Sequence, residues 1–283
     1  MEIKFENVDF AYDKINYKKC EILNDINLQF KKGMINGIVG KSGSGKTTLI
    51  ELSDALLIPT NGKIKIGDYI IEKDKKINNL NDIHFHIGYV FECPEEEFFG
   101  NTVKAELAFG MEINDFKTSE IETRVKEALM MVGLKESYLD KNPFELSNGE
   151  KRLVAIASAL IYNPDILILD EPTIGLDTIG KKNLIKIIRT LKKRYGKTII
   201  IVTHDIDMLH SIADYIFVLN DKKIVMEGTK YDIFKEEDKL KKYDISCPKI
   251  IEFSNLVLKK KQIKIGYRDD INDLIKDIYR YVK

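Results

Sequence analysis

The sequence predicts an α/β fold built around a buried parallel β-sheet, and three observations support this prediction. Two continuous apolar runs, residues 165–170 and 198–203, are separated by the helical pattern of residues 180–196. A third short apolar run, residues 34–39, leads directly into a glycine-rich loop. Apolar strands that alternate with helices are typical of a parallel sheet covered on both faces.

The N-terminal part of the chain predicts a second, antiparallel β subdomain. Residues 2–39 alternate between apolar and polar side chains, and residues 62–71 return to this pattern after a helix expected at 46–56. Alternation with a period of two residues indicates strands with one buried face. Near the other end, residues 215–228 predict a β-hairpin around an Asn-Asp turn.

Residues from about 94 to 163 predict a helical subdomain. Ser119 and Glu122 have the spacing of a capping box, and apolar residues behind them recur with helical spacing. A further helix is expected from about residue 150 to 161. These helices interrupt the α/β pattern, so we expect them to form a separate lobe of the main domain.

The chain changes character after about residue 236, and we expect a main domain at 1–236 and a C-terminal helical appendage at 237–283. Residues 247–261 and 268–283 each predict a short amphipathic helix. Their apolar faces suit either packing onto the main domain or dimerisation, and the sequence alone leaves both readings open.

Composition narrows the classes of function. Lys and Arg number 45, and so do Asp and Glu, so the chain has no basic excess for nucleic acid. Three widely spaced cysteines form neither a disulfide framework nor paired zinc ligands, which favours a reducing cytosol. The N-terminus does not resemble a signal peptide. The apolar run 153–162 is shorter than the roughly 20 residues that span a bilayer. Another chain would have to hold this one at a membrane.

The strongest motif is GKSGSGKT at Gly40–Thr47, which matches G-x-x-x-x-G-K-[ST] between a predicted strand and a predicted helix. Backbone N–H groups of such a loop point at phosphate oxygens, the lysine neutralises the β- and γ-phosphates, and the hydroxyl after it ligates Mg²⁺. We expect these nucleotide-binding residues: Gly40, Lys41, Ser42, Gly43, Ser44, Gly45, Lys46, Thr47 and Thr48.

Two further strands end in polar side chains. ILILDEPT places Asp170 and Glu171 at the carboxyl end of a buried strand, where α/β sheets bind ligands. We expect Asp170 to hold Mg²⁺ and Glu171 to polarise the attacking water. IVTHD places His204 after the next strand, where it suits contact with the γ-phosphate. Each feature alone also fits an ordinary turn, but the phosphate loop makes that reading weak.

A fourth motif, LSNGE at Leu146–Glu150, precedes a predicted helix. Ser147, Asn148 and Gly149 offer a hydroxyl and free amides to an anion. The same residues are also preferred N-caps, so the segment taken alone supports both readings.

In this order the motifs resemble the ATP-binding cassette ATPases. Gly40–Thr47 is similar to the Walker A loop, Leu146–Glu150 to the LSGGQ signature, and Asp170 with Glu171 to Walker B and the catalytic carboxylate. The resemblance implies a P-loop NTPase cassette with a RecA-like sheet. It also matches Leu176–Asp177 to the D-loop, His204 to the switch histidine and Tyr12 to the aromatic residue that stacks on adenine.

Within that family the chain resembles the ATPase subunit of energy-coupling factor transporters. Residues 90–110, the helix EKRLVAIASAL and the C-terminal appendage are similar to that group. The resemblance implies a peripheral subunit on the cytoplasmic face of the cell membrane. It would pair with a second ATPase subunit, in a homo- or heterodimer, and hydrolyse ATP with Mg²⁺ to import vitamins or transition-metal ions. A membrane scaffold subunit would contact Glu95–Phe99, and a substrate-binding membrane subunit would act through that scaffold.

Two positions depart from the family pattern. Glu92 replaces the Q-loop glutamine, and as a hard oxygen donor it can still bind Mg²⁺. Asn148 replaces the first signature glycine, although Ser147 and Gly149 keep their identity. These departures suggest one alternative, a poorly hydrolysing or regulatory partner in a heterodimeric pair. A second alternative, the ATPase of another ABC transporter type, is disfavoured by residues 93–99 and the C-terminal appendage.

Overall fold

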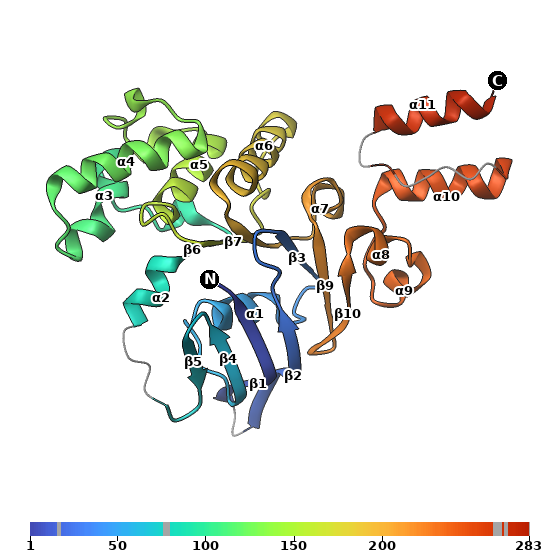
Figure 1. Ribbon diagram of the computed structural model, residues 1–283, viewed down its shortest axis with the longest axis horizontal. Coiled ribbons are helices and arrows are strands. Elements are labelled where there is room, and N and C mark those ends of the chain that lie inside the picture. Colours follow the sequence, from blue (N-terminus) through green and yellow to red (C-terminus); the bar gives the residue numbers. More distant parts are fainter. Residues whose placement is uncertain (16–17, 76–79, 263–267, 269–270, 283) are drawn as a thin grey trace.

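The computed structural model describes residues 1–15, 18–75, 80–262, 268 and 271–282, and contains two β-sheets with helices around them (Figure 1). The smaller sheet is antiparallel and has the strand order β2-β1-β4-β5. Its strands are β1 (Ile3–Ile15), β2 (Lys18–Gln29), β4 (Asn61–Ile66) and β5 (Tyr69–Glu72). This sheet confirms the predicted N-terminal β subdomain.

The larger sheet has the order β10-β9-β3-β8-β7-β6, and its strands from β9 to β6 are parallel. They are β3 (Ile35–Val39), β6 (Ile87–Val90), β7 (Ile166–Asp170), β8 (Thr198–Val202), β9 (Tyr215–Asn220) and β10 (Lys223–Thr229). β9 and β10 pair antiparallel as a hairpin, as expected. The three strands predicted from apolar runs, β3, β7 and β8, form the middle of the sheet.

The hydrophobic core lies on both faces of this sheet. Along β7, Leu167 and Leu169 join the cluster beneath the helical lobe, whereas Ile166 and Ile168 join the cluster beneath the antiparallel sheet. Side chains of a strand point alternately to its two faces. Because both faces are covered, no position of β7 faces solvent, and Ile166–Leu169 are all apolar. In β3 the buried Asn36 is the exception, and its side-chain amide donates to the carbonyls of Lys31 and Met34.

The helical lobe lies at one end of the molecule, on the left in Figure 1. It contains α3 (Val103–Ile113), α4 (Thr118–Val132) and α5 (Asn148–Ala159), with short 3-10 turns η1 (Pro94–Glu96), η2 (Glu136–Tyr138) and η3 (Pro143–Glu145). Elsewhere lie α1 (Lys46–Ser53), α2 (Leu80–His86), α6 (Thr178–Tyr195) and α7 (Ile206–Ile212). The predictions of α1 and of a helical lobe are confirmed.

The predicted capping box at Ser119 and Glu122 is wrong. α4 begins at Thr118, and its N-cap residue Lys117 makes no side-chain capping bond. Ser119 therefore lies inside the first turn, where its carbonyl accepts a bond from the Thr123 hydroxyl. The capping box of the lobe instead belongs to α5.

The C-terminal region consists of α8 (Lys230–Phe234), α9 (Glu237–Lys242), α10 (Lys249–Lys261) and α11 (Ile271–Val282). Leu240, Ile245 and Ile251 join the main hydrophobic cluster, so the first part of this region packs onto the body. α10 and α11 project from the body at the right of Figure 1. The division at residue 236 and a dimerisation role stay predictions.

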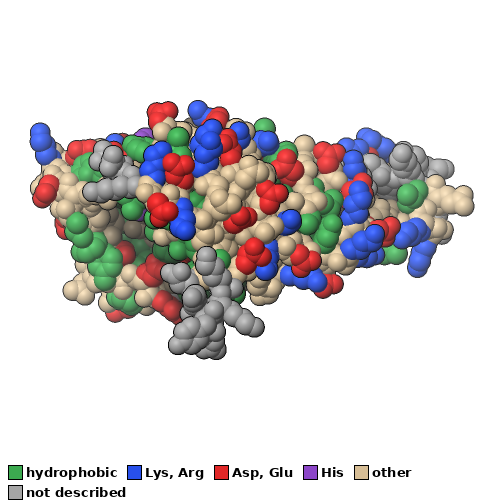
Figure 2. Space-filling model, turned by 90° about the horizontal axis from the view of Figure 1, so that it is seen from below, with side chains coloured by type: hydrophobic (Ala, Val, Ile, Leu, Met, Phe, Trp, Pro, Cys, Tyr) green, Lys and Arg blue, Asp and Glu red, His purple; other side chains and the backbone are tan. Residues whose placement is uncertain are grey.

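The surface mixes both signs of charge. Acidic and basic side chains are interspersed over the face shown in Figure 2, and basic ones gather at the end that carries α10 and α11. Within the described part of the chain, no helix is both long and apolar enough to cross a membrane.

Candidate functional site

The loop between β3 and α1 has a backbone that only glycines fit at several positions. Gly43 and Gly45 have φ values of +74° and +100°, in the left-handed region. At Gly40 an added Cβ would lie 2.2 Å from the Leu219 carbonyl oxygen. These glycines let the loop turn tightly into the N-terminus of α1, where the helix leaves N–H groups free for an anion.

Lys46 is the cation at the centre of this loop, and its side chain is almost fully buried. Its Nζ donates to the carbonyl oxygens of Gly40 at 3.0 Å and Lys41 at 2.9 Å. Burial lowers the pKa of the Lys46 ammonium, and the nearby carboxylates of Glu171 and Asp170 oppose this shift. The carbonyl oxygens carry only partial negative charge. A phosphate bound at the loop would give the Lys46 ammonium a full negative charge to pair with.

Thr47 and Asp170 bring two oxygen donors together from different elements. The Thr47 hydroxyl lies 3.3 Å from Asp170 Oδ2 at the end of β7. Burial, followed by the charge of Glu171, raises the pKa of Asp170 to about 6. No cluster of three or more His, Cys, Asp or Glu side chains in the described residues could hold a metal ion alone. This donor set suits Mg²⁺, which is commonly bound by one or two carboxylates and substrate phosphates.

Glu171 is held in an unusual backbone conformation just beyond β7. Its φ is +43°, and its N–H donates to the Val202 carbonyl at 2.8 Å. Oε2 accepts bonds from the Thr203 hydroxyl at 2.9 Å and the His204 N–H at 3.2 Å. Oε1 is buried, accepts no hydrogen bond from the described residues, and lies 3.5 Å from His204 Nε2. One carboxylate oxygen is fixed by two hydrogen bonds, whereas the other makes none with the described residues and lies beside the imidazole of His204.

These groups line one cavity of about 370 Å³. Its predicted site residues are Ser42, Gly43, Gly45, Lys46, Thr47, Thr48, Glu92, Asp170, Glu171 and His204. The structure thus brings together side chains from β7, from the loops after β3, β6 and β8, and from the start of α1. The pattern of apolar strands that end in polar residues predicted most of this convergence.

Other predicted residues lie beside the cavity. Gly40 and Lys41 line a neighbouring cavity, and Lys41 Nζ pairs with Asp244 Oδ2 at 2.7 Å. Ser44 has a buried hydroxyl without a partner among the described residues. Tyr12 is 40% exposed, and its hydroxyl lies 3.4 Å from Thr48 Oγ1. The roles assigned to these residues stay predictions.

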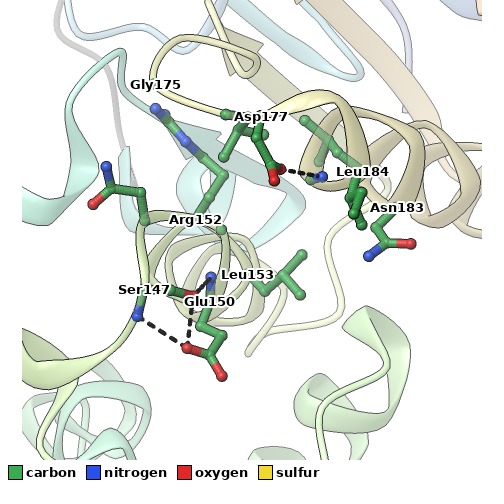
Figure 3. A pocket seen from close by; sticks show the side chains of 13 residues that line it. Ser147, Glu150, Arg152, Leu153, Gly175, Asp177, Asn183 and Leu184 are labelled. Atoms are coloured by element: carbon green, nitrogen blue, oxygen red, sulfur yellow. Dashed lines mark hydrogen bonds between the residues drawn. The ribbon is translucent and has the colours of Figure 1, made fainter.

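Ser147 and Gly149 line a different cavity, between the N-terminus of α5 and that of α6 (Figure 3). Ser147 caps α5 in a reciprocal capping box with Glu150. Leu176 and Asp177 line the same cavity, and Asp177 caps α6 by accepting the Gly180 N–H at 2.7 Å. Within one chain, the two groups of motif residues therefore form separate walls.

Sequence reasoning missed Arg152, which is 3% exposed. Its guanidinium donates to the carbonyls of Glu92 at 2.8 Å, Phe91 at 3.3 Å and Ile174 at 3.3 Å. In Figure 3 the side chain rises from α5 towards Gly175. Arg152 thereby joins the signature helix to both loops that flank the first cavity. The only signal in the sequence was the position of Arg152, which directly precedes the largely apolar run of residues 153–160.

Aromatic side chains line a smaller cavity of about 220 Å³. Its lining includes residues just before and just after Glu92 in the sequence. Phe99 is 52% exposed, and its ring lies 4.0 Å from that of Phe109. Glu97 also lines this cavity, while the Glu95 side chain lies outside the described residues. Glu96, Glu97 and Phe99 are all exposed, so this segment offers both acidic and aromatic groups at the surface.

Comparisons with known proteins agree with this geometry. The model of the ABC transporter family matches residues 23–174. Two curated relatives named "Energy-coupling factor transporter ATP-binding protein EcfA2" align over 260 residues, which are 92% of this chain and 90% of each relative. The protein of Enterococcus faecalis is 38% identical, and that of Caldanaerobacter subterraneus is 41% identical.

Two solved structures share the fold. The cbiO1 protein of Clostridium perfringens, described as part of the ABC transporter complex cbiONQ, has a TM-score of 0.75 and 31% identity. That match covers 90% of this chain and 98% of the other. The dimeric cassette MJ0796, bound to ADP and Pi, has a TM-score of 0.70 and 29% identity, with 81% and 98% of the chains covered.

Proposed function

Because the chain belongs to the family of ABC transporter ATP-binding proteins, we propose that it is the ATP-hydrolysing motor of an energy-coupling factor importer. We further propose that its cargo is a vitamin or a transition-metal ion. The observation that carries the proposal is the single cavity that contains Lys46, Thr47, Asp170 and Glu171. The family and the EcfA2 relatives support ATP hydrolysis coupled to transport.

The phosphate loop binds the nucleotide. Backbone N–H groups around Gly43 and Gly45, with the Lys46 ammonium, bind the β- and γ-phosphates in a cavity that is partly closed to water. Tyr12 contacts the adenine ring from the side of Thr48. The hydroxyl of Thr47 and the carboxylate of Asp170 hold Mg²⁺, and Glu92 adds a third oxygen ligand from the same cavity. When bound, Mg²⁺ neutralises the charge on the phosphates.

Glu171 acts as the general base. Its free oxygen, Oε1, accepts a proton from a water molecule in the cavity, while bonds to Oε2 from Thr203 and His204 prevent the carboxylate from rotating away. The His204 imidazole, which lies beside Oε1 and remains half-exposed, contacts the γ-phosphate. A base within hydrogen-bond reach of a held water is the arrangement that general-base catalysis requires.

A second ATPase subunit completes the site. The signature residues Ser147 and Gly149 line a wall of this chain that does not face its own phosphate loop. They would close over the nucleotide of a partner subunit, and the partner's signature would close over this one. The dimeric MJ0796 cassette supports this pairing.

The chain works at the cytoplasmic face of the membrane as a peripheral subunit. Within Glu95–Phe99, the acids and the exposed Phe99 ring, which packs on the exposed Phe109, suit a basic, amphipathic helix of a membrane scaffold subunit. The scaffold in turn acts on a substrate-binding membrane subunit.

The test is an ATPase assay on the purified chain, alone and with the membrane proteins that co-purify with it. Glu171→Gln keeps the shape of the side chain but removes the base. We expect it to bind ATP normally and to reduce steady-state hydrolysis by roughly a hundredfold or more. Unchanged hydrolysis in this variant would contradict the role of Glu171. Recovery of the chain without any polytopic membrane protein would contradict the importer.

A further inference from the structure

We propose that Glu150 is a positioning residue that weakens this chain's hold on the terminal phosphate of a nucleotide bound to a second ATPase subunit. It does so by accepting the hydrogen bond that the Ser147 hydroxyl donates. This inference rests on the proposed function, because it concerns the wall that a partner's nucleotide would meet. It also makes the two nucleotide sites of a heterodimer unequal.

The contacts of Glu150 use the single donor of the Ser147 side chain. Glu150 Oε2 accepts the Ser147 hydroxyl at 2.6 Å and the Ser147 N–H at 2.9 Å (Figure 3). In return the Ser147 oxygen accepts the Glu150 N–H at 3.4 Å. A serine hydroxyl has one proton. While Glu150 holds that proton, Ser147 can turn only lone pairs towards an incoming phosphate.

Glu150 is a carboxylate under all ordinary conditions. Hydrogen bonds from the hydroxyls of Ser147 and Tyr138 hold the pKa of Glu150 at about 2. The Tyr138 bond is 2.6 Å long and fixes the other oxygen, Oε1. Charge-assisted bonds of this length are strong ones. A bound phosphate would therefore have to compete with a fixed carboxylate for the hydrogen bond of the Ser147 hydroxyl.

The surrounding wall adds to the cost of placing a phosphate there. Asp177 is a second acidic side chain of the same cavity, and its carboxylate caps α6. The Arg152 guanidinium also borders the cavity but donates to three backbone carbonyls. The Ser147 hydroxyl oxygen, which should bind the phosphate, lies 2.6 Å from a negatively charged oxygen of Glu150. This charge repels an approaching phosphate.

A glutamine at position 150 would remove the charge and leave only a weaker, neutral acceptor for the Ser147 hydroxyl. Its carbonyl oxygen can still accept the Ser147 N–H and keep the cap, while its amide donates a proton and carries no charge. The Ser147 hydroxyl would then donate preferentially to the charged phosphate, which is a stronger acceptor than a neutral amide. A hydrogen bond to a charged group corresponds to about a tenfold change in affinity. Glu150→Gln should therefore strengthen ATP-driven association of two subunits about tenfold.

The experiment uses the full chain carrying Glu171→Gln, so that ATP is not consumed. Subunit association is followed by analytical ultracentrifugation against ATP and ADP. The chain is paired with the second ATPase that co-purifies with it if it does not self-associate. Glu150→Gln and Glu150→Ala should both associate at about tenfold lower ATP, with no change in ADP. Glu145→Gln removes an exposed charge from the same lobe and should behave like the parent.

Two further measurements separate this role from a structural one. Binding of a fluorescent ATP analogue to the separate subunit should be the same in all variants, because its phosphate loop lies in another cavity. In a Ser147→Ala background the gain from Glu150→Gln should disappear, because Glu150 acts through that hydroxyl. A gain that persists without Ser147, or no gain in either variant, would overturn the inference. Failure of every variant to bind ATP would instead refute the proposed function.

Discussion

Replacement of Arg152 by methionine tests how the helical lobe is joined to the nucleotide cavity. Methionine has similar length and fills the space, but it cannot donate to the carbonyls of Phe91, Glu92 and Ile174. The bond to Glu92 is the shortest at 2.8 Å, and the other two are 3.3 Å. Arg152→Met therefore leaves three carbonyls without their charged donor. Water cannot easily replace it, because the Arg152 side chain is only 3% exposed.

The expected loss follows from these lengths. Hydrogen bonds that involve a charged group contribute about 1.5 to 3 kcal/mol, and the two long bonds fall well below that range. Removal of a buried cation returns part of its desolvation cost. We expect a net loss of about 3 kcal/mol in the free energy of unfolding, which lowers the Tm by roughly 6 to 12 °C in a protein of this size.

Calorimetry or thermal circular dichroism measures this shift, and an ATPase assay on the same samples measures its effect on function. Turnover should fall, because the Ile174 carbonyl belongs to the turn that starts at Glu171, where the Ile174 N–H donates to the Glu171 carbonyl at 3.2 Å. Arg189→Met is the matched control, since exposed Arg189 donates to one carbonyl, that of Ser211. A Tm within 2 °C of the parent, about the effect of 1 kcal/mol, together with normal turnover would refute this reasoning.

Two other predictions concern buried carboxylates. Burial raises the pKa of Asp54 to about 7 from 3.8, so folding stability should fall by about 4 kcal/mol as pH rises from 4 through 7 and stay level above. Asp54→Asn should lack this decline in pH-dependent urea unfolding, and a parallel decline in both proteins would refute it. Burial, then Glu171, then Glu92 raise the pKa of Asp170. Glu92→Gln should therefore move the acid limb of the ATPase pH profile to lower pH, whereas a shift to higher pH would contradict the effect.

The sequence predicts the sheet and the first cavity well for the same physical reason. Strands such as β7 are buried on both faces, so their composition is constrained at each position, and polar residues appear only where the strand leaves the core. Asp170 and His204 were predicted as site residues because they lie at or just beyond the carboxyl ends of such strands. The glycines of the phosphate loop were predicted because few other loops require several glycines so close together in the sequence.

What the sequence did not predict depends on contacts between distant segments. Arg152 donates hydrogen bonds to carbonyls of residues that are 22 to 61 positions away in the sequence. No local sequence pattern reveals these partners. Glu150 belonged to the predicted signature segment, but its hold on Ser147 required the geometry of the helix start. The wrong capping box at Ser119 has the same origin, because spacing alone does not decide which residue lies at the N-cap.

The left-handed backbone of Glu171 links the chemistry of this protein to its evolution. A non-glycine residue with positive φ costs roughly 1 to 2 kcal/mol, and here the cost falls on the residue that we propose as the general base. Selection for thermal stability alone would favour glycine or asparagine at this position. A laboratory lineage screened only for heat resistance should therefore lose the glutamate early. A lineage screened for growth on the imported compound should retain it and acquire its stability elsewhere.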